Sequence, residues 1–536
     1  MKKTIDCLII GHNETNFSDN EKMLRKTGVD KGLYREMNLG FIKYNDKACT
    51  ISDILNLLRY NDPKEQGGMG KFGLSNTFSA TIAYLGTYLF RRGLSFDFIH
   101  SFQDEKEELK IKLMENDVKS IAISTTLIIS VFPIVEMVSF IRKHSEKTRI
   151  IVGGPFINNM MYLEDEVSFQ YLLNLMNADF YINSTQGEET LARLANAVKS
   201  GLTAEEVPNI YYKSGRKYIA THQEREDNKL NENMVDWTIF KDRLGYLANL
   251  RTSISCPFKC SFCNFPQRAG KYQTSSVEAV ERELNSIERT GKVQNIVFID
   301  DTFNVPVDRF KDILRMMIKN KYSFKWNSYF RCQFADREMV ELMKESGCNG
   351  VFLGIESANS QMLKNMNKSA TVEQYANGIR LLKEVGIFTE VSFFIGYLGE
   401  TEETVRDTIR FIEETAPDFY RVQAWYCLKN SPFWAEKDKY GVEGLELEWS
   451  HKTMDSRKAF DLVENTIKTI KNSVFVPIYT FDLAGIVNLI QRGFSVEQVK
   501  KLLQSFDDGL REKLATGNME ASPEVINKIR EACFQR

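Results

Sequence analysis

The sequence predicts an α/β protein with three parts: an N-terminal doubly wound domain, a partial (β/α)6 barrel and a mainly helical C-terminal domain. Two successive series of short apolar runs that alternate with amphipathic stretches predict the first two parts. After Tyr440 the pattern becomes mainly helical. A length of 536 residues agrees with several domains, because domains average about 150 residues.

The first series, within residues 1–205, predicts a Rossmann-like parallel sheet with helices between its strands. The expected strands are 5–10, 96–100, 120–124, 149–152 and 180–183, and the expected helices are 80–92, 106–116, 133–144 and 188–199. About 70 residues separate the first strand from its helix, including a Gly-rich turn at 66–70. Because so long a connection is usually functional, residues 13–76 are interpreted as an insertion.

Residues 206–244 are interpreted as a linker, since they contain only two short β-like pieces, at 209–212 and 217–221, and a charged stretch. The second series then predicts strands at 250–255, 295–299, 324–330, 351–355, 390–395 and 421–426, with helices at 276–290, 307–319, 338–346, 371–385 and 402–414. Six such units indicate an incomplete barrel over 245–435. Helical patterns at 456–472, 482–492 and 496–505 indicate a closing domain over 436–536.

Composition and charge exclude several classes of protein. The apolar stretch at residues 5–10 is too short for a signal peptide, and no run approaches the roughly 18 apolar residues that cross a bilayer. The formal net charge of -2 provides no overall basic field for nucleic acid or an anionic membrane. Six of the nine cysteines are widely scattered, which argues against a secreted disulfide framework. We therefore expect a cytoplasmic protein with no nucleic-acid or membrane partner.

The remaining cysteines, Cys256, Cys260 and Cys263, form a CxxxCxxC motif directly after the first expected barrel strand. Three thiolates can bind three irons of a [4Fe-4S] cubane and leave the fourth iron open to a small molecule. The alternative is a zinc site, but zinc prefers four ligands, and no nearby Cys or His supplies the fourth. The motif also lies at the carboxyl end of a barrel strand, where barrel enzymes carry their chemistry.

This motif, with Phe262 before its last cysteine, resembles that of the radical S-adenosylmethionine (SAM) superfamily over roughly residues 245–430. In that family the open iron binds SAM, and electron transfer cleaves a C–S bond. The segments 298–303, 354–357 and 394–401 resemble the family's methionine-binding, ribose-binding and GxPGET pieces, although the first lacks Gly-Gly-Glu and Leu398 replaces the common Pro. The cofactor-binding residues implied are Phe262, Asp301 in preference to Asp300, Glu356, Ser357 and Gly396.

Each of these residues also has an ordinary structural interpretation. A strand-end carboxylate such as Asp300, Asp301 or Glu400 is as often a helix N-cap as a ligand. Arg331, just after the third expected barrel strand, can hold the SAM carboxylate bidentately or form a structural ion pair.

The N-terminal domain resembles the cobalamin-binding domain of cobalamin-dependent radical SAM enzymes. The matching cofactor-binding residues are Ser124 and Thr126 after the third strand, Gly153 and Gly154 after the fourth, and His12 after the first. Small residues suit these strand ends because ligands of open α/β sheets need close backbone approach there. The corrinoid signature DxHxxG is absent around His12, so a capping or structural role competes with cobalt ligation. The alternative ligand is a nucleotide or flavin, although no GxGxxG follows the first strand.

Segments 7–14, 423–434 and 449–455 resemble the family of phosphinothricin-type P-methyltransferases and bacteriocin-maturation radical SAM methyltransferases. The implied reaction moves a methyl group from methylcobalamin to an unactivated carbon or a phosphinate phosphorus. Catalytic candidates are Tyr426, Cys427 and His451, with Trp425 and Trp449 as substrate contacts. Core packing is the competing explanation for the aromatic residues, and a buried thiol for Cys427.

Two other classes of function remain open at this point. The same motifs suit a cobalamin radical SAM enzyme that catalyses cyclisation, rearrangement or peptide modification without net methylation. A non-enzymatic corrinoid or iron-sulfur carrier is the other class. The resemblance implies a small-molecule or peptide substrate and an electron donor such as flavodoxin or ferredoxin.

Overall fold

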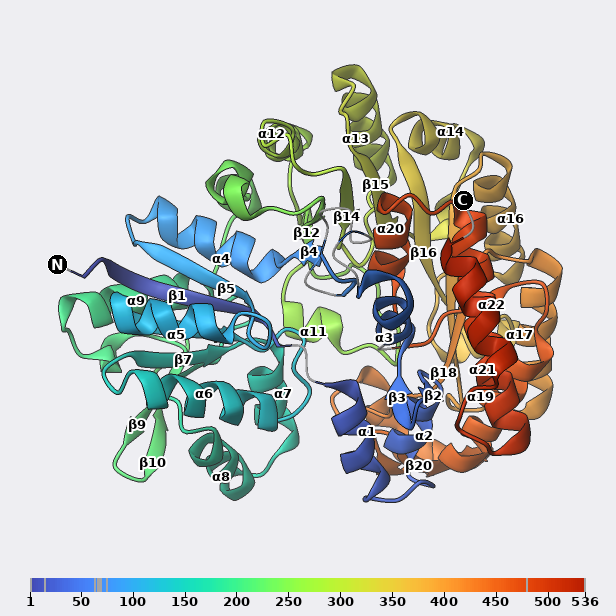
Figure 1. Ribbon diagram of the computed structural model, residues 1–536, viewed down its shortest axis with the longest axis horizontal. Helices are drawn as coiled ribbons and strands as arrows, with labels where there is room; N and C mark the ends of the chain where they lie inside the picture. The colour runs from blue at the N-terminus through green and yellow to red at the C-terminus, as the bar shows by residue number, and fades with distance from the viewer. Residues whose placement is uncertain are drawn as a thin grey trace.

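The computed structural model describes residues 2–13, 16–61, 64, 70–73, 76–478 and 481–534, and it contains two large parallel sheets (Figure 1). Most of the Gly-rich turn at 66–70 and Glu14 lie outside the described residues. The predicted fold class is confirmed: a doubly wound sheet precedes an open, barrel-like parallel sheet, and helices dominate the C-terminal region.

The first sheet has seven strands in the order β10-β9-β8-β7-β6-β1-β5. Its parallel strands are β1 (Thr4–His12), β5 (Phe96–Ser101), β6 (Asp117–Ser124), β7 (Arg149–Gly153) and β8 (Phe180–Ile182). All five were predicted. β1 lies between β5 and β6 and is buried on both faces, since Cys7 and Ile9 belong to one apolar cluster and Leu8 and Ile10 to another.

Helices cover both faces of this sheet. α4 (Ala80–Arg91) and α9 (Glu188–Ser200) pack on the face of Cys7, while α5 (Lys106–Glu115), α6 (Phe132–His144) and α8 (Glu166–Met176) pack on the other. α7 (Pro155–Leu163) and α8 were not predicted. α8 lacks a one-sided apolar pattern, because Val167 and Tyr171 are 79% and 65% exposed.

The segment interpreted as a linker, residues 206–244, differs from that expectation. β9 (Ile210–Ser214) pairs antiparallel with β8, and β10 (Lys217–Ala220) pairs with β9, so the two strands extend the first sheet. Farther along, a 3-10 helix (Trp237–Arg243) buries Trp237 and Phe240 in the apolar cluster that continues into the second sheet. The two sheets therefore share one core.

The second sheet contains eight parallel strands in the order β22-β18-β17-β16-β15-β14-β11-β4. The strands are β4 (Thr77–Phe78), β11 (Leu247–Leu250), β14 (Asn295–Phe298), β15 (Lys325–Tyr329), β16 (Cys348–Glu356), β17 (Phe388–Ile395), β18 (Phe419–Ala424) and β22 (Val474–Phe475). Its helices include α12 (Val277–Glu288), α13 (Val307–Asn320), α14 (Arg337–Glu345), α15 (Ser360–Asn365), α16 (Val372–Glu384) and α17 (Glu402–Thr415).

The first barrel strand ends at Leu250, where the prediction began it. Side chains hold the following residues instead of strand neighbours: Tyr84 bonds the backbone of Arg251, and Asp300 accepts from the backbone of Thr252. Ser253 and Ile254 then form β12, which pairs with the short strand β13 (Gln273–Thr274). At this point the apolar pattern in the sequence reflects buried side chains, and not hydrogen bonding to the neighbouring barrel strands.

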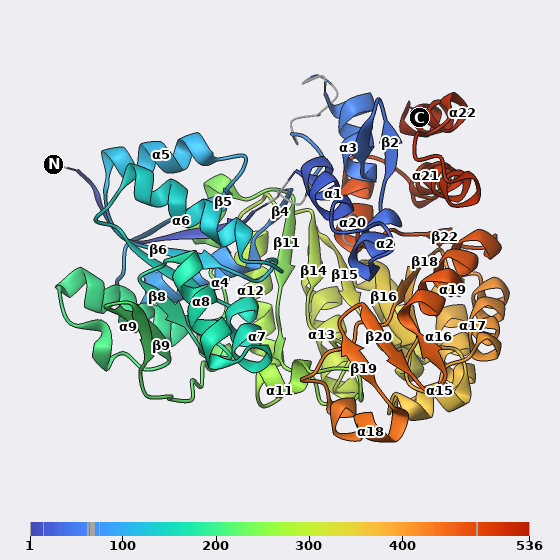
Figure 2. The ribbon, with the colours of Figure 1, turned by 90° about the horizontal axis from the view of Figure 1, so that it is seen from below.

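The described helices and strands of the long insertion pack beside the C-terminal region. Its elements α1 (Phe17–Arg25), α2 (Gly32–Asn38), β2 (Ile42–Tyr44), β3 (Lys47–Cys49) and α3 (Ile51–Leu55) lie beside the C-terminal helices in both views (Figures 1 and 2). Lys513 donates to the carbonyls of Asn38 and Phe41, and Lys43 N donates to Met519 O at 2.8 Å. The insertion and the C-terminal helices therefore form one packed unit beside the barrel.

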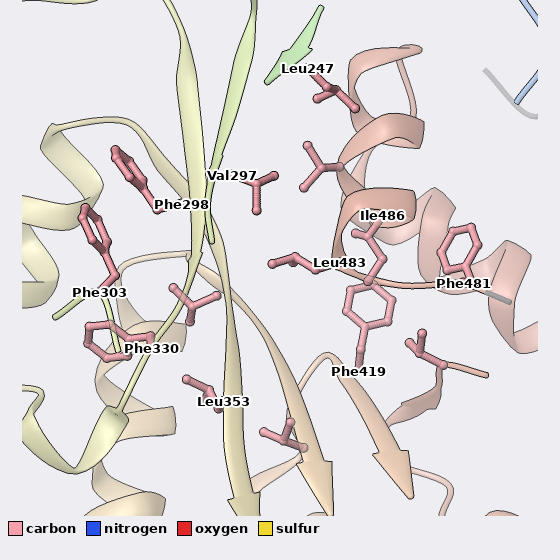
Figure 3. Close-up of a cluster of buried hydrophobic side chains, with 14 of the residues drawn as sticks. Leu247, Val297, Phe298, Phe303, Phe330, Leu353, Phe419, Phe481, Leu483 and Ile486 are labelled. Carbon is pink, nitrogen blue, oxygen red and sulfur yellow. The ribbon is translucent and has the colours of Figure 1, made fainter. Parts of the chain in front are cut away.

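The C-terminal region contains the predicted helices α19 (Ser456–Thr469), α20 (Leu483–Gln491) and α21 (Val496–Thr516), followed by α22 (Pro523–Phe534). A small sheet, β19 (Glu443–Leu445), β20 (Glu448–His451) and β21 (Met454–Asp455), was not predicted. Figure 3 shows Leu483 and Ile486 of α20 facing Leu247 and Phe419, the first residues of β11 and β18. α20 thus closes the amino-terminal side of the strands and leaves the carboxyl side for ligands. No described helix has the length and apolar character needed to cross a membrane.

Candidate functional site

The three cysteines lie on residues 256–263, here called the cluster loop, which begins two residues after β12. Cys260 is buried, whereas Cys256 and Cys263 are partly exposed. Ser255 enters the loop at φ 68°, a left-handed conformation that costs a non-glycine residue conformational energy. Such strain persists only where surrounding contacts fix the chain, and those contacts come from the far side of the barrel.

Ser261 is the main anchor of the cluster loop. Its backbone N donates to Met366 O at 2.9 Å, and its hydroxyl is 2.6 Å from the Tyr397 hydroxyl. Phe433 N donates to Ser261 O at 2.9 Å. Phe262 packs edge-to-face on Phe394, with ring centroids 5.0 Å apart. Phe262, which was expected to contact a cofactor, therefore also packs the cluster loop against β17.

Arg331 lies against the cluster loop. Its guanidinium stacks 3.6 Å from the Phe258 ring centroid, and its Nη2 is 3.9 Å from Cys260 Sγ. Burial raises the pKa of Cys256, and the nearby Arg331 charge partly offsets that rise. Burial also raises the pKa of Cys263 to about 11, with repulsion from Cys260, Asp301 and Cys256 adding to it. These mutual effects place the three thiols and Arg331 in one neighbourhood, where a bound metal would have to displace the thiol protons.

The donor set fits a [4Fe-4S] cubane, because three thiols on one short loop can bind three separate irons and leave the fourth iron open. Among the described residues, no three His, Cys, Asp or Glu side chains are arranged to hold a single metal ion. Arg331 also fits a polar ligand, because its Nη1 is buried with no hydrogen-bond partner among the described residues.

The two candidate aspartates after β14 differ in their surroundings. Asp300 is buried and accepts from Thr252 N and Ser253 N, both at 2.7 Å, and from the Thr252 hydroxyl at 2.6 Å. Its role is to hold the chain between β11 and the cluster loop. Asp301 reaches solvent, yet the protein around it removes enough hydration to raise its pKa to about 6, with Asp300 adding to the shift. Asp301 is thus the more accessible of the two carboxylates, and its contact with a cofactor stays a prediction.

At the end of β16, Glu356 has a φ of 73° and lies 3.5 Å from the ammonium of Lys368, whose side chain is buried. Lys368 also donates to Gly354 O at 2.6 Å. A Cβ on Gly354 would lie 2.6 Å from Glu356 Oε1, so a side chain there would displace the Glu356 carboxylate. Ser357 is buried, and its hydroxyl accepts from Asn359 N. The orientation of Glu356 at the carboxyl end of the barrel is therefore fixed. Lys368 could not be identified from the sequence, because only folding pairs it with Glu356.

Gly396 and His451 have structural partners that the sequence did not reveal. A Cβ on Gly396 would come within 2.3 Å of Trp449, and the glycine has a φ of 104°. His451 stacks on Trp449 with an interplanar angle of 3°, and its Nε2 lies 2.9 Å from Gly396 O. Thr453 bonds its Nδ1. Both ring nitrogens are thus engaged, so His451 fastens β20 to the residue that follows β17, and its catalytic role stays a prediction.

The two candidates next to the sixth strand differ in exposure. Tyr426 is 37% exposed and is accessible to a substrate. Cys427 is fully buried, and burial raises its pKa to about 12, so its thiol stays protonated and unreactive at neutral pH. This geometry corrects the catalytic role considered for Cys427. Trp425 is buried, and its carbonyl accepts from Trp449 Nε1 at 2.8 Å, which agrees with core packing.

At the first sheet, the predicted small residues gather at the carboxyl edge. The hydroxyls of Ser124 and Thr126 are 2.9 Å apart, and Thr126 is 3.3 Å from the Thr81 hydroxyl. Gly153 O accepts from Thr125 N at 2.9 Å. Gly154 has a φ of 116°, and a Cβ there would meet the Thr125 hydroxyl at 2.8 Å. Glycine at this position therefore lets β6 and the start of α7 approach closely.

His12 lies at the same edge, with its ring 5.1 Å from that of His100. Burial lowers the pKa of His12 to about 4, so the ring is neutral near pH 7. Three buried polar atoms at this edge, His12 Nδ1, Asn13 Nδ2 and Asn158 Oδ1, have no hydrogen-bond partner among the described residues. Unpaired buried polar groups are rare in proteins, so this edge suits a ligand that carries its own hydrogen-bonding groups.

The two edges meet through α11 (Phe265–Ala269), which follows the cluster loop directly. Arg268 Nη1 donates to Asn159 Oδ1 of α7 at 3.0 Å. Figures 1 and 2 both draw α11 beside α7, between the two sheets. Sequence reasoning missed this pair, because nothing in a single sequence links positions 109 residues apart.

Comparison with known proteins agrees with this geometry. The family model of the radical SAM superfamily matches residues 250–412, which contain the cluster loop, Arg331 and Glu356. The chain therefore contains a radical SAM domain over these residues. An uncharacterized methyltransferase of Pyrococcus horikoshii is 26% identical over 323 residues, which cover 58% of this chain and 66% of that relative. The anaerobic magnesium-protoporphyrin IX monomethyl ester cyclase of Rubrivivax gelatinosus is 28% identical over 246 residues, 44% of each chain.

Two solved structures resemble this chain over most of its length. The radical SAM methyltransferase TsrM of Kitasatospora setae, solved with cobalamin and a [4Fe-4S] cluster, has a TM-score of 0.61 at 16% identity, covering 85% of this chain and 97% of that chain. The cobalamin-dependent SAM radical enzyme OxsB, with aqua-cobalamin and SAM bound, has a TM-score of 0.56 at 16% identity, covering 85% of this chain and 76% of that chain. At such identities the likeness establishes a shared fold.

Proposed function

We propose that this chain is a cobalamin-dependent radical SAM methyltransferase that moves a methyl group from methylcobalamin to an unactivated carbon or phosphinate phosphorus. The proposal rests on one observation: the carboxyl edges of the two sheets, where ligands are expected to bind, lie next to each other. The cluster loop lies beyond β11, and α11 brings it to α7, which begins at the Gly-rich edge of the first sheet. A methyl donor on one edge and a radical source on the other would then flank one substrate.

When bound, the cluster with SAM supplies reductive C–S cleavage, and the corrinoid supplies the methyl group. The chain itself contributes position and charge. Cys256, Cys260 and Cys263 hold the cluster. Arg331 is placed for the SAM carboxylate, since its Nη1 is buried and unpartnered among the described residues. Glu356, fixed by Lys368, faces the same carboxyl edge and is placed to accept from ribose hydroxyls.

At the first sheet, Ser124, Thr126, Gly153 and Gly154 form the backbone edge against which the corrinoid would lie. His12 is neutral and packs against His100, and it does not need to ligate cobalt for this placement. Tyr426 is the exposed candidate for substrate contact. The acceptor is a small molecule or a peptide, and the electron required for SAM cleavage comes from a donor such as flavodoxin or ferredoxin.

A second candidate function is cyclisation or rearrangement without net methylation. The match to the magnesium-protoporphyrin cyclase over 246 residues favours it, because the same cofactor-holding residues serve either outcome. The two candidates differ in the fate of the SAM methyl group.

Anaerobic reconstitution with iron, sulfide and hydroxocobalamin tests the proposal. Reduction in the presence of SAM labelled in its methyl group should yield 5'-deoxyadenosine and labelled methylcobalamin. Retained corrinoid with 5'-deoxyadenosine but no labelled methylcobalamin would favour the second candidate. A chain that retains no corrinoid would refute both.

A further inference from the structure

Arg268 has a partly buried guanidinium with an unusual partner. Its single described polar contact is a neutral amide, since Nη1 donates to Asn159 Oδ1 at 3.0 Å. No carboxylate of the described residues lies within 4.0 Å of its side-chain nitrogens. Burial lowers the pKa of Arg268, and its interactions with Cys263 and Asp301 only partly oppose that effect.

Several other arginines of the described residues with poorly exposed side chains are paired with carboxylates. Arg251 has Glu188 at 3.4 Å, Arg35 has Glu464 at 2.6 Å, and Arg421 pairs with Glu390. Buried charges are normally paired, because removing a charge from water is costly unless an opposite charge and hydrogen bonds replace the lost hydration. An arginine that keeps only an amide partner is suited to an anion that is not part of the chain.

The position of Arg268 indicates where such an anion would lie. The residue follows Cys263 by five positions, and Asn159 belongs to the helix that starts at Gly154. Arg268 therefore bridges the cluster loop and the edge proposed for the corrinoid. A group bound there would lie between the two cofactors, which is where the methyl acceptor must be placed.

We propose that Arg268 binds an oxyanion of the methyl acceptor, a carboxylate or a phosphorus oxyanion, and that Asn159 orients the guanidinium for it. The inference rests on the proposed function and adds a substrate class to it. Guanidinium binds such groups through two parallel N–H···O bonds, which fixes the direction of the acceptor as well as its charge. Arg268 Nη1 is engaged by Asn159, which leaves Nη2 and Nε to make that pair of bonds.

The carboxylate of SAM is the alternative oxyanion for Arg268. Arg331 is better placed for it, because this arginine lies against Cys260 and has its Nη1 buried without a described partner. The two sources are separated by measuring oxyanion binding while SAM is already bound.

The experiment uses the full chain, reconstituted anaerobically with its cluster and corrinoid and saturated with SAM. Methylphosphonate is titrated and its binding followed by the broadening of its phosphorus NMR line. The neutral dimethyl ester of methylphosphonate serves as the probe without charge, and acetate as a competing carboxylate. The variants are Arg268→Met, Arg268→Lys and Asn159→Ala, with the exposed Arg410→Met as the matched control.

The wild-type chain and R410M should bind methylphosphonate but not its dimethyl ester, and acetate should compete. R268M should weaken binding at least ten-fold, equivalent to about 1.4 kcal/mol, while R268K should retain most of the affinity and N159A should lose a few-fold. Unchanged affinity in R268M would overturn the inference, and so would a SAM-saturated wild-type chain that does not bind methylphosphonate. Because the titration involves no turnover, a chain that binds the probe through Arg268 but forms no 5'-deoxyadenosine would refute the proposed function alone.

Discussion

The guanidinium of Arg331 is stacked on Phe258 and directed at the thiol of Cys260, with 3.9 Å between Nη2 and Sγ. Asn304 fixes the backbone of Arg331 from both sides, accepting from its N at 2.9 Å and donating to its O at 3.0 Å. The charge therefore occupies a constant position beside the cluster loop. A fixed positive charge favours the more negative, reduced form of a cluster bound there.

Replacing Arg331 by Met should lower the midpoint potential of the reconstituted cluster by on the order of 50 mV, from Coulomb's law at an intermediate effective dielectric constant. Arg331→Lys keeps the charge and should recover most of the shift. Spectroelectrochemical titration measures the potential in each protein. Equal potentials in R331M and the wild type would show that the charge does not act on the cluster.

Asp300 and Asp301 should respond oppositely to substitution. Asp300→Ala leaves Thr252 N, Thr252 Oγ1 and Ser253 N without their buried acceptor, which should cost roughly 2–4 kcal/mol of unfolding free energy. Asp301→Ala, at an exposed side chain, should change stability by less than about 0.5 kcal/mol but impair reductive SAM cleavage. Urea unfolding and 5'-deoxyadenosine formation measure the two effects. The assignment fails if D301A is the less stable variant.

Gly396 should tolerate no side chain. Gly396→Ala would place a Cβ within 2.3 Å of Trp449 and force a side chain to a φ of 104°, so we expect a loss of roughly 2–4 kcal/mol. Trp449→Phe in the same chain should restore part of the stability by making room for the Cβ. Thermal unfolding of the single and double variants checks this coupling, and purely additive losses would argue against it.

His12 and His100 should make the protein less stable in acid. Burial lowers the pKa of His12 to about 4 and that of His100 to about 3, the latter also through repulsion by His12. Since unfolded histidines take up protons near pH 6.5, the unfolded chain binds more protons than the folded one between about pH 4 and 6.5. The contribution of these two histidines to the free energy of unfolding should therefore be complete above pH 6.5. It should decrease as the pH falls toward 4.

His12→Gln should flatten that decline, whereas the exposed His222→Gln serves as a matched control and should leave it unchanged. Melting temperatures between pH 4.5 and 7.5 provide the measurement. A decline of equal steepness in H12Q and H222Q would mean that other groups cause the acid sensitivity.

Much of the fold was predictable because strands and helices leave local periodicity. β1 and the other parallel strands of the first sheet are apolar runs, and the CxxxCxxC spacing identified the cluster loop without any tertiary information. The pairing of β9 and β10 with β8, and of β4 with β11, could not be predicted, because hydrogen bonds between strands depend on neighbours that are distant in sequence.

The site was predictable to the same extent. Asp301 and Arg331 stand beside recognisable motifs, and the structure brings both near the three thiols. The partners of His451, Lys368 and Arg268 come from other elements, 12 to 109 residues away, so no local pattern could distinguish a fastening histidine from a catalytic one.

Replacing Cys256, Cys260 and Cys263 one at a time by alanine tests the central claim most directly, with the buried Cys348→Ala as control. Iron content, cluster absorbance and 5'-deoxyadenosine formation are measured after anaerobic reconstitution. We expect each of the three variants to lose the cluster and SAM cleavage, while C348A keeps both. Full iron content and undiminished SAM cleavage in any one of the three would contradict the account.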